Sequence, residues 1–234
     1  MISGIITALE DEIKPLVERM SGVTEIQALR RTFYRGEISG QEIVAVGSGV
    51  GKVRASACSQ FLIDKFGIEQ MIVFGLAGGL DRDLRIGDLV ISKMTIMHDY
   101  YVAGEGVNED ISIGPIEADP NLLELALKAS KSISPEDRVR VGIILTGDES
   151  IDDSQRKDDL RRKYNGDCVE MEGAAIALTC SLNLIPFVIV RSISDFADET
   201  AHQQFEDTFG QAISMSVQVV LKMLRLMSEE RQKL

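Results

Sequence analysis

Acidic residues at the ends of apolar segments are the side chains of this sequence best suited to proton transfer. Glu12 follows an apolar run near the N-terminus, Glu170 and Glu172 precede an apolar helical pattern, and Asp195 follows the most apolar run of the chain. Ligands of covered α/β sheets gather at the carboxyl ends of strands, so acids placed there could serve as general acids or bases. The same acids could instead cap helices or complement a helix dipole.

Two glycine-rich turns, at residues 47–52 and 75–80, each follow an apolar strand pattern. Neither turn fits a phosphate-binding Walker sequence. In the first turn, Lys52 follows the glycines too closely and is followed by Val53 rather than Ser or Thr. Neither turn fits GxGxxG. Such glycines let a backbone approach a ligand or simply make a tight turn. Their equivalent places after two strands favour a ligand site.

The elements that must position these residues alternate between strand and helix along the chain. This alternation predicts an α/β protein, a three-layer αβα fold with a central mixed, mostly parallel twisted sheet, as a single domain over residues 1–234. A hairpin at 33–46 makes the predicted sheet mixed. The predicted strands are 2–9, 42–46, 71–76, 89–96, 139–146 and 186–193, and the predicted helices are 11–20, 52–66, 121–130, 155–163, 172–182 and about 205–230.

Composition excludes several classes of function. With 37 acidic and 25 basic residues the formal charge is −12, which disfavours binding to nucleic acid or to an anionic membrane. No apolar run reaches the roughly 18 residues of a membrane span, and the N-terminal run lacks the basic flank of a targeting segment. Three scattered cysteines and two histidines, His98 and His202, argue against disulfides or a metal site. We expect a cytoplasmic protein.

Six segments together resemble the bacterial 5′-methylthioadenosine/S-adenosylhomocysteine nucleosidases, which share the purine nucleoside phosphorylase/hydrolase fold. The match runs in the family's order over essentially the whole chain, and the combination of VEMEG with RSISDFAD is its most specific part. The segments are GIITALEDEI, SGVGK, GLAGGL, IGD, VEMEGAAIA and VRSISDFAD.

The resemblance implies hydrolysis of an N-glycosidic bond, which releases adenine and a 5-thio-substituted ribose without a cofactor or metal. It assigns Glu12 as the base for the attacking water, Glu172 with Met171 to the ribose, and Asp195 with Ser194 to the purine. Such roles suit the chemistry, since an oxocarbenium-like transition state needs a protonated leaving base and an oriented water. The other substrate contacts that it implies are Glu170, Arg191, Ala77, Gly78, Ile151, Val50 and Phe205, with Val50 and Phe205 lining the pocket of the 5′ group.

Three places depart from the family pattern. Leu76 replaces a small hydroxyl residue, and Ser150 stands near the position of an aromatic ring that often stacks on adenine. Phe196 is our candidate for a replacement stacking surface. Segment 100–116 carries Gly, Glu and Gly at 104–106, where relatives tend to place apolar side chains over the 5′ group. These departures leave the substrate less defined than the reaction.

Other functions therefore stay open. A related hydrolase could act on 5′-deoxyadenosine or a futalosine-type nucleoside. A purine nucleoside phosphorylase would need cations around phosphate, whereas the first strand leads into the acidic ALEDEI segment. A nucleoside-binding protein without catalysis has no need of all three acids, Glu12, Glu172 and Asp195.

The resemblance also implies a homodimer in which segment 100–116 lies near the neighbouring subunit and helps to close the 5′ pocket. The closing helix carries an apolar stripe of Met215, Val219 and Met223. A stripe of this spacing faces either the core of its own chain or a partner.

Overall fold

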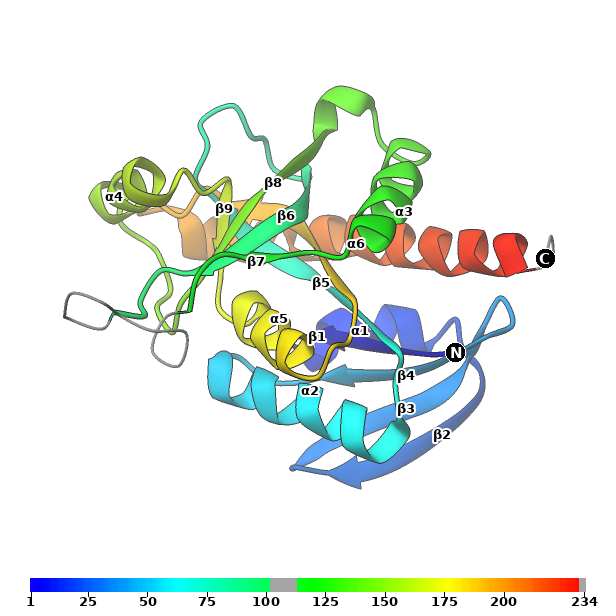
Figure 1. Ribbon diagram of the computed structural model, residues 1–234. Coiled ribbons are helices and arrows are strands. Elements are labelled where there is room, and N and C mark those ends of the chain that lie inside the picture. Colours follow the sequence, from blue (N-terminus) through cyan, green and yellow to red (C-terminus); the bar gives the residue numbers. More distant parts are fainter. Residues whose placement is uncertain (102–112, 232–234) are drawn as a thin grey trace.

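The computed structural model describes residues 1–101 and 113–231 as a single-domain α/β fold, with a central mixed sheet flanked by helices (Figure 1). The predicted α/β class and mixed sheet are confirmed. The strand order is β10-β6-β8-β9-β5-β1-β4-β3-β2, with β7 paired to β6. The strands are β1 (Ile2–Thr7), β2 (Ser21–Ala28), β3 (Arg31–Ile38), β4 (Gln41–Gly47), β5 (Gln70–Gly79), β6 (Leu89–Met97), β7 (Ile116–Glu117), β8 (Val139–Thr146), β9 (Cys168–Glu170) and β10 (Phe187–Asp195).

Parallel pairing dominates the centre of the sheet. β1 lies parallel to both β4 and β5, and β10 lies parallel to β5, whereas the hairpin strands β2, β3 and β4 are antiparallel. β10 also pairs with β6, so β10, β6, β8, β9 and β5 form a closed ring of pairings. β5 and β10 are buried along their whole lengths, as their continuous apolar sequences predict.

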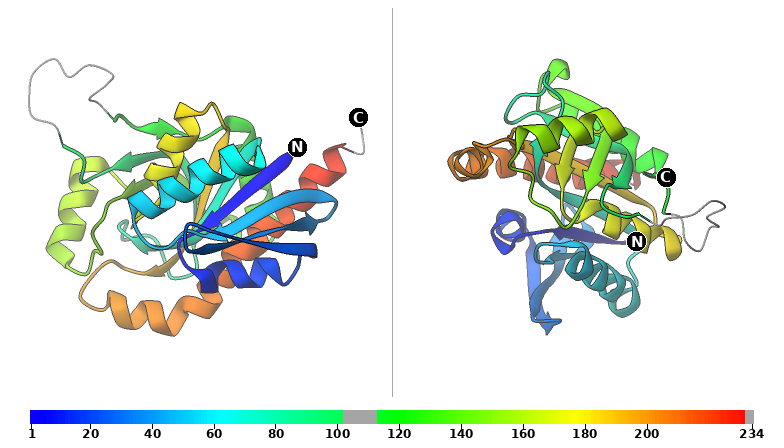
Figure 2. Two further views of the ribbon diagram at one scale, coloured as in Figure 1. Left: turned by 90° about the horizontal axis from the view of Figure 1, so that it is seen from below. Right: turned by 90° about the vertical axis from the view of Figure 1, so that its left-hand side faces the viewer.

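The helices cover both faces of the sheet. One core cluster joins the sheet to α1, α3 and α6 and contains Ile5, whereas a second joins it to α2 and α5 and contains Ile6. The two neighbouring residues thus point to opposite faces of β1, as strand geometry requires. The right-hand view of Figure 2 shows α1 and α6 on one side of the sheet and α2 on the other. The helices are α1 (Glu10–Val17), α2 (Lys52–Phe66), α3 (Pro120–Lys131), α4 (Ser154–Tyr164), α5 (Gly173–Leu182) and α6 (Ala201–Arg231), with a short 3-10 turn at Glu136–Arg138.

Four elements differ from the sequence prediction. β7 and β9 were not predicted, because they are only two and three residues long. β2 was not predicted, because it is a largely exposed edge strand without an apolar run and is held by its pairing with β3. α6 begins at Ala201 rather than near Phe205, because its first turn is polar and carries no apolar period. No helix within 1–101 and 113–231 is both long enough and apolar enough to cross a membrane.

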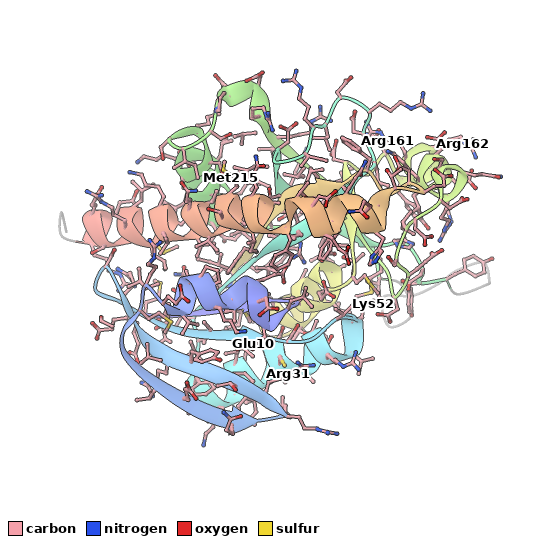
Figure 3. The ribbon with its side chains drawn as sticks, turned by 180° about the vertical axis from the view of Figure 1, so that it is seen from behind. Glu10, Arg31, Lys52, Arg161, Arg162 and Met215 are labelled. Carbon is pink, nitrogen blue, oxygen red and sulfur yellow. The ribbon has the colours of Figure 1, made fainter. Side chains whose placement is uncertain are left out.

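The apolar stripe of α6 faces the core of its own chain. Val219 and Met223 are fully buried, and Met215, labelled in Figure 3, is partly buried against the same cluster. The stripe is therefore used for internal packing and gives no support to a helical dimer interface.

An aromatic cluster joins β3 to α2. Phe33 is fully buried, and its ring centroid lies 4.9 Å from that of Phe61 and 5.9 Å from that of Phe66. We predict that Phe33→Ala lowers the free energy of unfolding by about 3–5 kcal/mol, because it leaves a cavity in a packed core. Urea unfolding checks this, with Val141→Ala, at a 38% exposed position of β8, as control. A loss below about 1 kcal/mol would show that the cluster does not anchor the hairpin.

Candidate active site

A cavity of about 420 Å³ opens where several strands of the sheet end. Every predicted site residue except Arg191 lines it. They come from the ends of β5, β9 and β10, from the turn between β4 and α2, from the loop after β8, and from the starts of α1 and α6. The lining residues are Ala8, Leu9, Glu12, Val50, Leu76, Ala77, Gly78, Glu149, Ser150, Ile151, Asp152, Val169, Glu170, Met171, Glu172, Ser194, Asp195, Ala201, His202 and Phe205.

Sequence reasoning missed three charged or titratable residues of this lining. Glu149 and Asp152 lie in the loop between β8 and α4, so the rule that ligands gather after strands could have found them. His202 had no such signal, because it lies in the polar first turn of α6.

Glu12 is fixed by backbone donors at the start of α1. Its Oε2 accepts a hydrogen bond from the Leu9 N–H at 2.8 Å and its Oε1 one from the Leu76 N–H at 3.3 Å. The first bond is half of a capping box, so the helix-terminal role and the site role coincide in one side chain. Burial raises the pKa of Glu12, while Arg191 and the backbone donors act in the opposite direction. A carboxyl with a raised pKa is a stronger proton acceptor once it is ionised.

Arg191 lies behind the cavity wall with three carboxylates around it. It is 1% exposed, and its Nη2 donates to Glu170 and lies 3.8 Å from Glu172 Oε2. Nη1 donates to the Phe74 carbonyl at 3.3 Å. Arg191 was predicted to contact the substrate, but it does not line the cavity, because its guanidinium is enclosed by these partners.

Gly75 is the position that lets Arg191 and Glu12 approach each other. Its φ is +152°, and a Cβ built on it would overlap Arg191 Nη1 and lie 2.9 Å from Glu12 Oε1. A side chain at this position would therefore separate the cation from the carboxylate. The glycine turn after β5 thus serves the site through close approach of side chains.

Glu170 and Glu172 have different environments although they are two residues apart. Glu170 accepts hydrogen bonds from the Thr146 hydroxyl, from Arg191, and from the N–H groups of Glu172 and Gly173, so its oxygens are fully engaged. Glu172 accepts one from the Gly51 N–H at 2.9 Å. Burial, followed by the charge of Glu170, raises the pKa of Glu172 to about 7. Glu170 therefore has a structural role, because it joins neighbouring segments through hydrogen bonds. Glu172 has a carboxylate oxygen that can still bind a ligand in the cavity.

Asp195 is the last residue of β10, and its carboxylate accepts hydrogen bonds from two neighbouring groups. Its Oδ2 accepts from the Ser194 hydroxyl at 2.7 Å and its Oδ1 from the Ala197 N–H at 2.9 Å. Burial raises the pKa of Asp195 in spite of these donors, which by themselves lower it. A raised pKa increases the share of the neutral acid, which is the form that can donate a proton to a ligand.

The surface that would stack on a flat base is not supplied by Phe196. That residue does not line the cavity, and its ring lies under the Lys157 ammonium at 5.7 Å. Leu76, Ile151 and Val169 form apolar lining instead, with Ser150 at the edge. Residues 102–112 of the predicted 5′-pocket segment lie outside the described residues.

The lining is acidic and holds no lysine or arginine among the residues that the structure describes. Within the same residues, no group of three His, Cys, Asp or Glu side chains could hold a metal ion. The carboxyl groups that line the cavity can therefore serve as general acids and bases. They lie near the ends of several strands.

Comparison with known proteins gives consistent relatives. The model of the phosphorylase superfamily matches residues 3–225. The chain is 37% identical over 235 residues to a 5′-methylthioadenosine/S-adenosylhomocysteine nucleosidase of Geobacillus kaustophilus, covering 99% of this chain and 100% of the relative. It is 34% identical over 223 residues to an aminodeoxyfutalosine nucleosidase of Campylobacter jejuni, covering 94% and 96% of the two chains.

A solved structure agrees in fold over nearly the whole chain. The 5′-methylthioadenosine/S-adenosylhomocysteine nucleosidase of Neisseria meningitidis, in complex with methylthio-immucillin-A, superposes with a TM-score of 0.90 at 33% identity. The match covers 96% of this chain and 98% of the other.

The raised pKa of Glu172 makes stability depend on pH. Between its ordinary value of 4.5 and about 7 the folded chain keeps a proton that the unfolded chain has lost. Stability from this group is therefore complete below pH 4.5 and is lost as the pH rises through about 7. We predict that, relative to Glu172→Gln, the wild type loses about 1 kcal/mol of unfolding free energy per pH unit in this window. Urea unfolding at several pH values measures the difference, and a constant difference from about pH 5 to about pH 7 would contradict it.

Proposed function

Because the chain belongs to the phosphorylase superfamily, which it matches over residues 3–225, we propose that its cavity hydrolyses the N-glycosidic bond of 5′-methylthioadenosine and S-adenosylhomocysteine, giving adenine and a 5-thio-substituted ribose. The observation that carries the proposal is the convergence of Glu12, Glu172 and Asp195 on one cavity from three distant segments. Relatives with this activity in their names match nearly full length.

Asp195 is the proton donor in this proposal. Breaking the bond at C1′ leaves electrons on the purine, so a proton must reach the leaving base, at N7. Burial favours the neutral form of Asp195, and the Ser194 hydroxyl and the Ala197 N–H fix the direction of its carboxyl group. The proton passes from Asp195 to the base as the glycosidic electron pair moves onto the purine.

Glu12 and Glu172 act on the sugar side. Glu12 accepts a proton from a water molecule, whose oxygen then bonds to the cationic C1′. Glu172, with Met171 beside it, binds ribose hydroxyls through the carboxylate oxygen that the Gly51 N–H does not occupy. Negative charge in this region also stabilises an oxocarbenium-like centre.

Hydrolysis rather than phosphorolysis is supported by the charge of the lining. Phosphate would need cationic groups around it, and the lining within the described residues supplies carboxylates without lysine or arginine. A neutral water molecule meets no such repulsion.

The 5′ group lies toward Val50 and Phe205 in this proposal, since both are apolar residues of the cavity lining. Cleavage of aminodeoxyfutalosine is the second candidate, favoured by the Campylobacter jejuni relative and by the small Ser150 at the edge of the cavity.

A homodimer in the cytoplasm is the setting that we propose. Val53 and Leu182 are 80% and 76% exposed on the two packed helices α2 and α5, which leaves apolar surface for a partner. The three cysteines are buried and unpaired, which suits a reducing compartment. Light scattering at micromolar protein distinguishes a dimer from a monomer.

A nucleoside panel tests the reaction. We expect the purified chain to release adenine from 5′-methylthioadenosine at the same rate with and without inorganic phosphate, because water is the nucleophile. Chromatography measures adenine and the sugar product. A ribose 1-phosphate product would assign a phosphorylase, and a higher kcat/KM for adenosine or inosine would assign another nucleoside.

Two isosteric variants test the acid–base assignment. Glu12→Gln and Asp195→Asn keep side-chain shape and remove proton transfer, so we expect each to lower kcat about 100-fold or more. Thermal unfolding of both variants controls for folding. A variant that folds and keeps above about a tenth of the wild-type kcat would remove that residue from its assigned role.

A further inference from the structure

Two arginines converge on the glycine turn that borders the cavity. A Cβ built on Gly49 would overlap Arg31 Nη2 and lie 2.8 Å from Arg54 Cδ, so both side chains pass directly over this residue. Gly49 has a φ of +86°, a conformation that favours glycine. Arg31 comes from the first position of β3, and Arg54 from the first turn of α2.

The position of Arg31 follows from the strand that carries it. Side chains alternate along β3, so Arg31 shares a face with Phe33, which packs against Phe61 of α2. Arg31 therefore lies on the α2 face of the sheet, beside Arg54. Figure 3 labels Arg31 together with Lys52, the first residue of α2.

These two cations have no carboxylate partner in the part of the chain that the structure describes. Arg54 Nη1 donates to the Val50 carbonyl at 2.7 Å, which leaves its charge uncompensated. Lys52, two residues before it, is paired with Asp99 at 2.6 Å. Arg35, on the same strand as Arg31, is paired with Glu42. Two neighbouring like charges without an acid form an electropositive spot on a chain of net charge −12.

The spot adjoins one end of the cavity. The Gly49 N–H donates to the Ala8 carbonyl at 2.7 Å, and Ala8, Leu9 and Val50 line the cavity. Val50 is 37% exposed, so this end opens toward solvent. Under the proposed function the 5′ group lies toward Val50, and a substituent longer than a methylthio group must continue past it.

We propose that Arg31 and Arg54 form a subsite for a carboxylate at the end of the 5′ substituent. The inference rests on the proposed function and names its substrate class, adenine nucleosides with a 5′ chain that ends in a carboxylate. A guanidinium binds a carboxylate through paired N–H donors, and the positive end of α2 adds to the attraction. The subsite acts on binding of the tail and leaves the bond-breaking groups unchanged.

Three nucleosides separate the carboxylate from the rest of the substrate. S-Adenosylhomocysteine carries both an ammonium and a carboxylate, 5′-(3-aminopropylthio)adenosine lacks the carboxylate, and 5′-methylthioadenosine lacks both. For Arg31→Gln combined with Arg54→Gln we expect kcat/KM for S-adenosylhomocysteine to fall about tenfold, through KM, since a charge-assisted hydrogen bond is lost. The values for the other two nucleosides should stay within about twofold of wild type.

Arg35→Gln is the matched control, since it removes the same charge from the same strand at a position already paired with Glu42. It should leave all three values within about twofold of wild type. Equal losses on all three nucleosides in the double variant, or no loss on S-adenosylhomocysteine, would overturn the inference. So would inhibition of 5′-methylthioadenosine cleavage by inorganic phosphate that disappears in the double variant, because the subsite would then take a free anion.

A binding measurement tests this inference independently of the proposed function. Calorimetric titration of the same nucleosides into Glu12→Gln, with and without the two arginine substitutions, gives the affinity ratio without turnover. If the wild type releases no adenine, the proposed function fails while the affinity ratio still decides the subsite. The key quantity is the affinity for S-adenosylhomocysteine divided by the affinity for 5′-(3-aminopropylthio)adenosine. If the two arginine substitutions do not change this ratio, the subsite is refuted even in an active enzyme.

Discussion

The guanidinium of Arg191 is the charge around which the candidate site is built. A cation that is 1% exposed is stable only with paired charges and hydrogen bonds around it. Glu170 supplies the direct ion pair, and Glu172 and Glu12 add their charges from a greater distance. One cation near three carboxyl groups leaves an excess of negative charge in a buried region. Burial raises the pKa of Glu12 against the opposing charge of Arg191, and burial followed by the charge of Glu170 raises the pKa of Glu172.

The same cluster links the elements that carry the site. Arg191 lies on β10, Glu170 on β9, Glu172 just before α5, and Glu12 on α1. Glu172 reaches the turn before α2 through the Gly51 N–H, and Glu12 reaches β5 through the Leu76 N–H. Backbone donors of another segment therefore fix the position of each of these acids in the cavity wall. Asp195 stands apart from the cluster, so its protonation is set by its own burial and neighbours.

This separation gives the two ends of the cavity different chemistry. At the Asp195 end a neutral carboxyl can donate, and at the Glu12 end a carboxylate near Arg191 can accept. Two carboxyl groups with different environments are the usual means of combining acid and base catalysis at one pH. Beyond Val50 the charge reverses, because Arg31 and Arg54 lie over Gly49. The turn beside Val50 thus carries positive charge, whereas the cavity lining itself is acidic.

The class of fold, and three acids that the structure places in one cavity, could be read from local patterns in the chain. The predicted boundaries of β8 and α2 agree with those in the structure, because apolar runs and helical periods are local properties. Glu12, Glu172 and Asp195 were found because each follows or precedes such a run. Features that depend on contacts between distant segments could not be read in this way. The tertiary structure enclosed Arg191 behind the wall, moved Phe196 out of the cavity, and paired the exposed strand β2 with β3. It also brought Arg31 and Arg54 over Gly49, because packing across the sheet, rather than spacing along the chain, fixes which charges become neighbours.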